Sequence, residues 1–166
     1  MGFESNQPKP NYYGDRQIWL DSLGHLCFGV FPVAPDTILP ADSVYLRLGP
    51  GGTREIQRIL VSPTAYADGI WHQLVASLSP QGQFLYVDGS QVASNLKVTQ
   101  AAVFSGTWRF GGGSLLDWVG TNKREYFQGD VDEGNIAHLA RSPDWIRTSY
   151  YNLKFPKTFI RIEQPF

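Results

Sequence analysis

Residues 68–94 carry the pattern that most restricts the fold of this chain. The stretch reads DGIWHQLVASLSPQGQFLYVDGSQVAS, and its apolar residues nearly alternate before and after a Ser-Pro-Gln-Gly turn at 79–82. Asp88 and Gly89 then stand where a two-residue hairpin tip requires positive φ, which glycine adopts at little cost. The stretch therefore predicts two consecutive antiparallel β-hairpins.

Similar short apolar runs, separated by turn residues, recur along the chain. They cover residues 15–31 around an Asp-Ser-Leu-Gly turn, 44–61 around Pro-Gly-Gly, 106–112, and 127–140, where Gly134 interrupts the run. One helix is predicted, from the N-cap Ser142 to about Asn152, with Pro143 in its first turn. The pattern predicts an all-β antiparallel sandwich with one short C-terminal helix. We place it in a single domain at 15–166, after a polar segment at 1–14.

Composition and charge exclude several classes of protein. The formal net charge is −1, and the basic residues are scattered among acids, so nucleic-acid binding is not expected. The longest apolar runs have the length of strands, so membrane insertion is not expected, and the first residues lack the features of a secretory signal. Cys27 is the single cysteine and lies in an apolar run, which predicts a buried, inert thiol.

Two segments carry a family resemblance. DGIWHQLVASLSPQGQFLYVDGSQVAS resembles the "DGxWHxVxxxxxxxGxxLYVDGxxV" core of laminin-G-like, concanavalin A-like lectin/glucanase domains. Downstream, YFQGDVDEGNIAHLARSPDWI is similar to the "YFxGxIDEVxIYxxALS" ending of that family, and ARSPDWI followed by SYYN is similar to its bacterial extracellular members. The resemblance covers about 15–152. It implies a concanavalin A-like jelly roll and an extracellular or cell-surface location.

The chain departs from the family pattern in three places that bear on assembly. Residues 33–57 resemble an insertion that would supply some of a missing sheet edge. Members normally carry further strands before the segment that resembles DRQIWL, and Gly134 stands where they have Val. An incomplete jelly roll leaves unpaired strand edges, which can pair with other chains. The departures therefore suggest either a truncated domain or a sheet that a partner completes, and self-association through open sheet edges is one expected property.

The loop at 111–126 is the predicted ligand site. Lectin-like sites combine an aromatic platform with polar groups at a loop rim, and this loop offers five such residues. They are Asp117, Trp118, Asn122, Arg124 and Tyr126. The alternative is that the Trp118 ring folds back and covers one end of the sandwich. Trp19, Trp71, Trp108 and Trp145 are interpreted as core residues, and His72 as a surface residue or one bonded to a turn.

Calcium is the one cofactor that the resemblance suggests. Asp117, Asn122, Asp130 and Asp132 supply oxygen donors near one loop, as calcium prefers, and the alternative is that they are ordinary turn residues. No catalytic residues are predicted. Some relatives hydrolyse glucans with a Glu-x-Asp-x-x-Glu motif, and here Asp130 to Glu133 lack Glu at the required offsets.

Two functions remain open at this stage. The first is a non-catalytic recognition module that binds a carbohydrate or a protein surface, with or without calcium. The alternative is a structural subunit of a fibre, surface layer or virion, whose sandwich is completed by strands of another chain.

Overall fold

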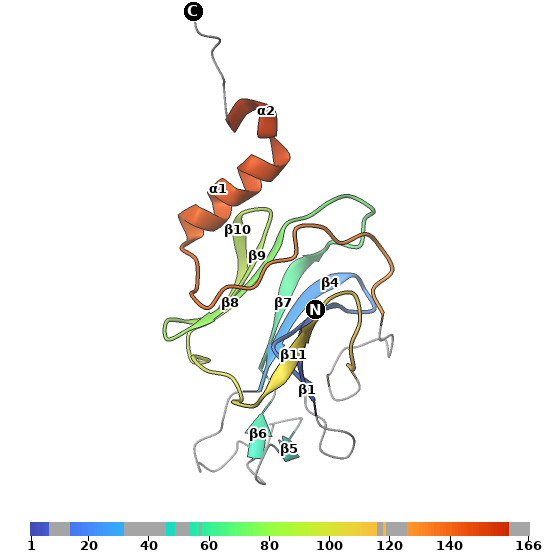
Figure 1. The fold of residues 1–166 in the computed structure, drawn as a ribbon, viewed down its shortest axis with the longest axis vertical. Coiled ribbons are helices and arrows are strands. Elements are labelled where there is room, and N and C mark those ends of the chain that lie inside the picture. Colours follow the sequence, from blue (N-terminus) through green and yellow to red (C-terminus); the bar gives the residue numbers. More distant parts are fainter. Residues whose placement is uncertain are drawn as a thin grey trace, which may run out of the picture.

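The protein is mostly β, with antiparallel sheets and helices near the C-terminus (Figure 1). The computed structural model describes residues 1–6, 14–31, 46–48, 54–56, 58–115, 118 and 126–159. The strands are β1 (Gly2–Ser5), β2 (Gly14–Asp15), β3 (Gln17–Leu20), β4 (His25–Val30), β5 (Leu46–Leu48), β6 (Arg54–Ile56), β7 (Arg58–Ala65), β8 (Leu74–Ser79), β9 (Gly82–Val87), β10 (Ser90–Asn95) and β11 (Gly106–Arg109). The helices are α1 (Pro143–Lys154) and α2 (Pro156–Phe159). Within the described ranges, no helix is long and apolar enough to cross a membrane.

The sequence predicts several tight turns between 15 and 92. Each of them that lies in the described ranges joins two antiparallel strands. β3 pairs with β4 across the Asp21–Gly24 turn, β8 with β9 across Pro80–Gln81, and β9 with β10 across Asp88–Gly89. Asp88 and Gly89 both have positive φ, at 52° and 76°. The predicted hairpins are therefore confirmed, and so are the pairing of β5 with β6 and the short strand β11.

The main core joins two three-stranded sheets, with the orders β3-β4-β7 and β10-β9-β8. Residues of both sheets contribute to one buried cluster, which also includes two residues after β10. Its buried members are Leu26, Phe28, Val30, Leu60, Leu85, Val87, Val98 and Ala101. A polar link crosses the same interface, because buried Gln83 on β9 donates from Nε2 to the Phe28 carbonyl of β4 at 2.9 Å. Gln83 and Phe28 therefore fix the two sheets relative to each other.

The third sheet has the order β11-β1-β2, and the sequence pattern did not reveal its central strand. Residues 1–14 were predicted to be a polar segment ahead of the domain, whereas Gly2–Ser5 pair with β11 on one side and β2 on the other. Asp15 fastens this sheet to its surroundings. Its fully buried carboxylate accepts the N–H of Phe31 at 2.8 Å and of Ala102 at 3.1 Å.

The segment 127–140 corrects the sequence prediction. It was expected to be a strand broken at Gly134, but the structure has no strand there, and every residue of the segment is exposed. Phe127 donates its N–H to the Gly111 carbonyl, next to a bridge between Gly112 and Tyr126. The chain then runs across the molecule to α1 without joining a sheet (Figure 1).

Helix α1 begins as predicted and runs two residues further than expected. Ser142 is the N-cap and accepts the N–H of Trp145 at 3.2 Å, while Asp144 occupies the first turn. Ile146 is the buried anchor of the helix, and Trp145 is exposed, so its assignment to the core was wrong. α1 packs on the β9–β10 turn, because a Cβ built on Gly89 would lie 3.1 Å from the Arg147 Cα.

Candidate functional site

The predicted ligand loop is only partly within the described residues. Asp117, Asn122 and Arg124 lie outside them, so their positions stay predictions. Tyr126 is described, and its ring is exposed beside the Gly112 bridge.

Trp118 lies in the interior, as in the alternative that we raised for it. Its side chain is 5% exposed and packs with Trp19, Phe31 and Cys27 in a second buried cluster. The ring centroid lies 4.5 Å from that of Phe31 and 5.3 Å from that of Trp19. Its ring also occupies the space that a Cβ on Gly29 would need. Trp118 therefore presents no ring face on which a ligand could stack.

Two other sequence predictions are settled by the same cluster. Trp19 and Cys27 are buried, as expected. Burial raises the pKa of the Cys27 thiol to about 12, and the nearby Asp21 charge adds to the effect. The thiol is therefore not ionised at neutral pH and is a poor nucleophile.

The predicted calcium ligands are not gathered into a site by the part that is described. Asp130 and Asp132 are exposed, and the described ranges contain no group of three or more His, Cys, Asp or Glu residues placed to hold a metal. The other two predicted ligands, Asp117 and Asn122, lie outside those ranges. Calcium binding therefore stays a prediction.

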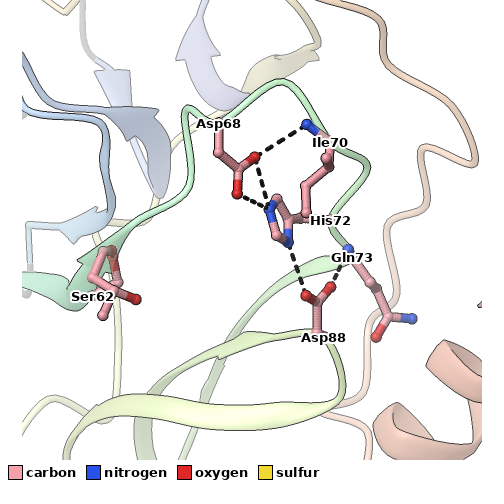
Figure 2. Close-up of polar contacts among 7 residues, drawn as sticks. Ser62, Asp68, Ile70, His72, Gln73 and Asp88 are labelled. Carbon is pink, nitrogen blue, oxygen red and sulfur yellow. Dashed lines mark hydrogen bonds and ion pairs between the residues drawn. The ribbon is translucent and has the colours of Figure 1, made fainter.

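The residues that the structure does bring together are Asp68, His72 and Asp88, which we call the histidine clamp (Figure 2). His72 lies in the loop between β7 and β8, and Asp88 in the β9–β10 turn. Nδ1 of His72 lies 2.8 Å from Asp88 Oδ2, and Nε2 lies 3.2 and 3.1 Å from Asp68 Oδ1 and Oδ2. The imidazole ring thus joins two loops that are 16 residues apart in the sequence.

Backbone hydrogen bonds support both carboxylates of the clamp. Asp68 Oδ1 accepts the N–H of Ile70 at 3.1 Å, and Asp88 Oδ1 accepts that of Gln73 at 3.0 Å (Figure 2). The Tyr66 ring meets the imidazole edge-on, with centroids 5.0 Å apart. The loop at 68–73 is therefore fixed at both ends and along one side.

The electrostatics of the clamp favour the imidazolium. Partial burial lowers the pKa of His72, but hydrogen bonds and charge from Asp88 and Asp68 outweigh it and raise the pKa above the ordinary value of 6.5. The pKa of Asp68 is lowered by its hydrogen bonds to the Ile70 N–H and to His72. An imidazole with both nitrogens engaged by carboxylates has no free nitrogen for a substrate. The clamp is built to hold structure.

Two large apolar side chains stand out from the loop that the clamp holds. Trp71 is 68% exposed and Ile70 is 67% exposed. The assignment of Trp71 to the core was wrong, because β8 begins only at Leu74 and the alternation of that strand does not extend back to Trp71. The spacing of Asp68 and His72 was a signal for the clamp, but the partner Asp88 becomes visible only when the hairpins are folded.

Ser62 lies on β7, and backbone groups hold its hydroxyl. Its hydroxyl donates to the Thr64 carbonyl at 2.7 Å and accepts the Leu26 N–H at 2.9 Å. The hydrogen bond with Leu26 ties β7 to β4, and the one with Thr64 stays within β7. The geometry therefore assigns Ser62 a structural role.

Comparison with known proteins places the chain in a family. No curated protein matches. A solved structure with the description "S-layer domain-containing protein (residues 221-444)" from Clostridium thermocellum is 18% identical, with a TM-score of 0.46. The alignment covers 90% of this chain and 61% of that one. The family model described as "Concanavalin A-like lectin/glucanases superfamily" matches residues 14–147. The chain belongs to the concanavalin A-like lectin/glucanases superfamily.

Proposed function

We propose that the protein is a non-catalytic recognition module of the β-sandwich type that binds carbohydrate at an extracellular or cell-surface location. Membership of the superfamily supports the lectin-like role and the sandwich architecture. The absence of the Glu-x-Asp-x-x-Glu motif from the sequence supports a role without catalysis. Neither nucleic acid nor a membrane interior is among the proposed partners.

The observation that carries this proposal is the exposed pair Ile70 and Trp71 on a loop held by the histidine clamp. Large apolar side chains that stay exposed next to one another on a rigid element are typical of interaction sites. A tryptophan face stacks on the apolar face of a sugar ring, and the clamp removes much of the entropy cost of ordering the loop on binding. The Asp68 carboxylate, whose side chain is 45% exposed, is a polar group beside it.

A glycan array followed by calorimetry tests the carbohydrate proposal. We expect the wild-type protein to bind a subset of glycans and Trp71→Ala to lose at least about tenfold in affinity, since aromatic anchors dominate small recognition sites. Trp145→Ala is the matched control, because Trp145 is also an exposed tryptophan but lies on α1. Equal loss in both variants, or no binding by the wild type, would count against the proposal.

A second candidate function, assembly into a structural polymer, is favoured by the segment 126–140. Its residues are all exposed and include large apolar side chains that no sheet covers. These are Tyr126, Phe127, Val131, Ile136 and Leu139. An extended apolar segment that joins no sheet offers backbone groups to a strand of another chain.

Light scattering behind a sizing column, over a range of concentrations, distinguishes the two candidates. Assembly predicts a defined oligomer or filament that Ile136→Lys reduces, because a buried lysine would disrupt an added strand. Leu23→Lys is the control, since Leu23 is also an exposed aliphatic residue but lies in the β3–β4 turn. A monomer at every concentration supports the recognition module.

Calcium assistance remains part of the recognition proposal as an additional property. Its support is the donor chemistry of Asp117, Asn122, Asp130 and Asp132. Calorimetry with calcium alone, repeated on Asp130→Asn with Asp132→Asn, tests it. We expect the wild type to give a heat of calcium binding and the double variant to give none. If the wild type gives no heat, calcium is removed from the proposal.

A further inference from the structure

We propose that the histidine clamp is a proton-dependent latch. It holds the Ile70–Trp71 loop in place when both ring nitrogens of His72 carry a proton. When one proton leaves, the contact between Asp68 and His72, which we call the Asp68 arm, is released. The latch is a property of the free protein. Its consequence for ligand binding rests on the proposed function, in which Trp71 is the contact residue.

The geometry of the clamp requires two protons on the imidazole. Each ring nitrogen faces an oxygen of a different carboxylate, at 2.8 Å for Nδ1 and 3.1 Å for Nε2. An ionised carboxylate only accepts hydrogen bonds, and a neutral imidazole carries a single N–H. When His72 is neutral, one carboxylate must face a lone pair. That arm then loses its hydrogen bond and gains repulsion in its place.

The Asp68 arm is the one that opens. Asp88 makes the shorter contact, and its other oxygen is fixed by the Gln73 N–H. The Asp68 side chain is 45% exposed against 30% for Asp88, so water replaces its contact more easily. The neutral ring therefore keeps its proton on Nδ1 toward Asp88. The Asp68 end of the loop is then held only through its own turn with Ile70.

The groups around the ring leave the two carboxylates as its dominant partners. From the end of β7, Tyr66 contributes a ring edge, and from the β9–β10 turn Asp88 contributes its charge. From α1, Ser149 accepts a hydrogen bond from the Gln73 side chain, and the Lys154 charge acts on Asp88 from a distance. Neither Asp68 nor Asp88 forms an ion pair with a lysine or arginine of the described part. His72 is thus the cation that neutralises this pair.

The direction of the effect follows from the preference for the imidazolium. The carboxylates raise the pKa of His72 in the folded protein, so the latch is closed in mildly acidic solution. As pH rises through the folded pKa, the Asp68 arm opens and the Trp71 loop gains freedom. A ligand that contacts Trp71 then has to order the loop on binding, which weakens binding by roughly three- to tenfold.

The test is a pH titration of the ligand-free protein by NMR. The His72 ring signals report its protonation, and the indole N–H signal of Trp71, assigned with Trp71→Phe, reports the order of the loop through its heteronuclear NOE. We expect the Trp71 indole to become more mobile with the same midpoint as the His72 titration, above pH 6.5. Asp68→Asn should move that midpoint to lower pH, because one carboxylate charge is lost.

Two controls make the result decisive. His72→Gln should abolish the pH dependence of the Trp71 signal, whereas His138→Gln, which changes an exposed histidine in the segment 127–140, should preserve it. An indole signal that stays equally ordered through the His72 titration, or that changes in the same way in His72→Gln, would overturn the latch. Absence of glycan binding with the latch intact would instead overturn the proposed function.

Discussion

Trp118 shows how a residue whose sequence neighbours are typical of a binding site can lie in the core. A tryptophan in a Gly-rich loop beside charged residues predicts a ligand platform. Its ring instead fills the space between Trp19 and Phe31, over a glycine that leaves room for it. The apolar area buried by a ring of this size outweighs what an exposed position would contribute to folding.

Replacement of Trp118 should therefore affect stability before it affects any ligand. We expect Trp118→Ala to lower the free energy of unfolding by about 3–5 kcal/mol, as large-to-small changes of buried aromatic residues do. Chemical denaturation followed by circular dichroism measures it. Trp71→Ala, at an exposed position, should change stability by no more than about 0.5 kcal/mol. Similar losses in both variants would contradict the burial of Trp118.

Gln83 is a second residue whose role depends on its buried partners. Its Nε2 donates to the carbonyls of Phe28 and Arg58, at 2.9 and 3.4 Å, from a fully buried side chain. We expect Gln83→Glu to destabilise the protein at neutral pH by at least about 3 kcal/mol, since a carboxylate would face two carbonyl oxygens without a proton. Gln83→Met, of similar size and uncharged, should cost about 1–3 kcal/mol.

The pH dependence of the Gln83→Glu variant has a definite sign. Burial and the two carbonyls raise the pKa of the new carboxyl in the folded state above its unfolded value of about 4.3. The protonated form can donate to Phe28, so the deficit relative to wild type should shrink as pH falls and grow as pH rises through the folded pKa. Denaturation of both proteins between pH 4 and 8 checks it. A deficit that does not change with pH would show that the side chain reaches water.

At the scale of elements, the β9–β10 turn is a support for α1 as well as a hairpin tip. Gly89 has a φ of 76°, and a Cβ there would lie 3.1 Å from the Arg147 Cα and 3.2 Å from the Tyr150 Cβ. We expect Gly89→Ala to lower the free energy of unfolding by about 1–2 kcal/mol because of the backbone conformation alone. A further loss of stability is expected because α1 must shift. Hydrogen exchange should show the loss of protection concentrated in α1.

Gly69 provides the matched control for this experiment. Its φ of 80° is nearly the same, but a Cβ there has no neighbour within 4 Å. Gly69→Ala should therefore show the backbone cost alone and leave exchange in α1 unchanged. If the two variants lost the same stability and protection, the turn would not support the helix.

The elements that the sequence predicted correctly are those whose signal is local. The turns at Asp21–Gly24 and Asp88–Gly89 require particular residues, and Ser142 with Pro143 marks the start of α1. β1 was missed because its four residues, GFES, have no alternation and pair only with distant β11 and β2. The strand prediction for 127–140 was wrong for the opposite reason. The segment has a strand-like composition, but it pairs with no sheet.

The candidate site follows the same division between local and distant contacts. Asp68 and His72 are four residues apart, and their positions in the family-like motif were visible in the sequence. Asp88 reaches His72 only because β8 and β9 are antiparallel and bring Val87 opposite Leu74. The clamp, and with it the exposed position of Trp71, therefore required the tertiary structure.

At the scale of the whole molecule, the clamp connects two parts of the chain that belong to different sheets of the core. It joins the loop that follows β7, in one sheet of the core, to the β9–β10 turn in the other sheet. The clamp and the hydrogen bond from Gln83 to Phe28 hold the two sheets together at separate points. Global stability should therefore respond to the protonation of His72.

The sign of that response follows from linkage. Because the pKa of His72 is raised in the folded protein, the contribution of the clamp is fully present below the unfolded pKa and is lost as pH rises through the folded one. We expect the difference in free energy of unfolding between wild type and His72→Gln to be largest in mild acid and to decline toward alkaline pH. Urea denaturation of both proteins from pH 5 to 9 measures it. A difference that instead grew with pH would mean that His72 is held neutral, and the clamp would then work through one hydrogen bond and not through charge.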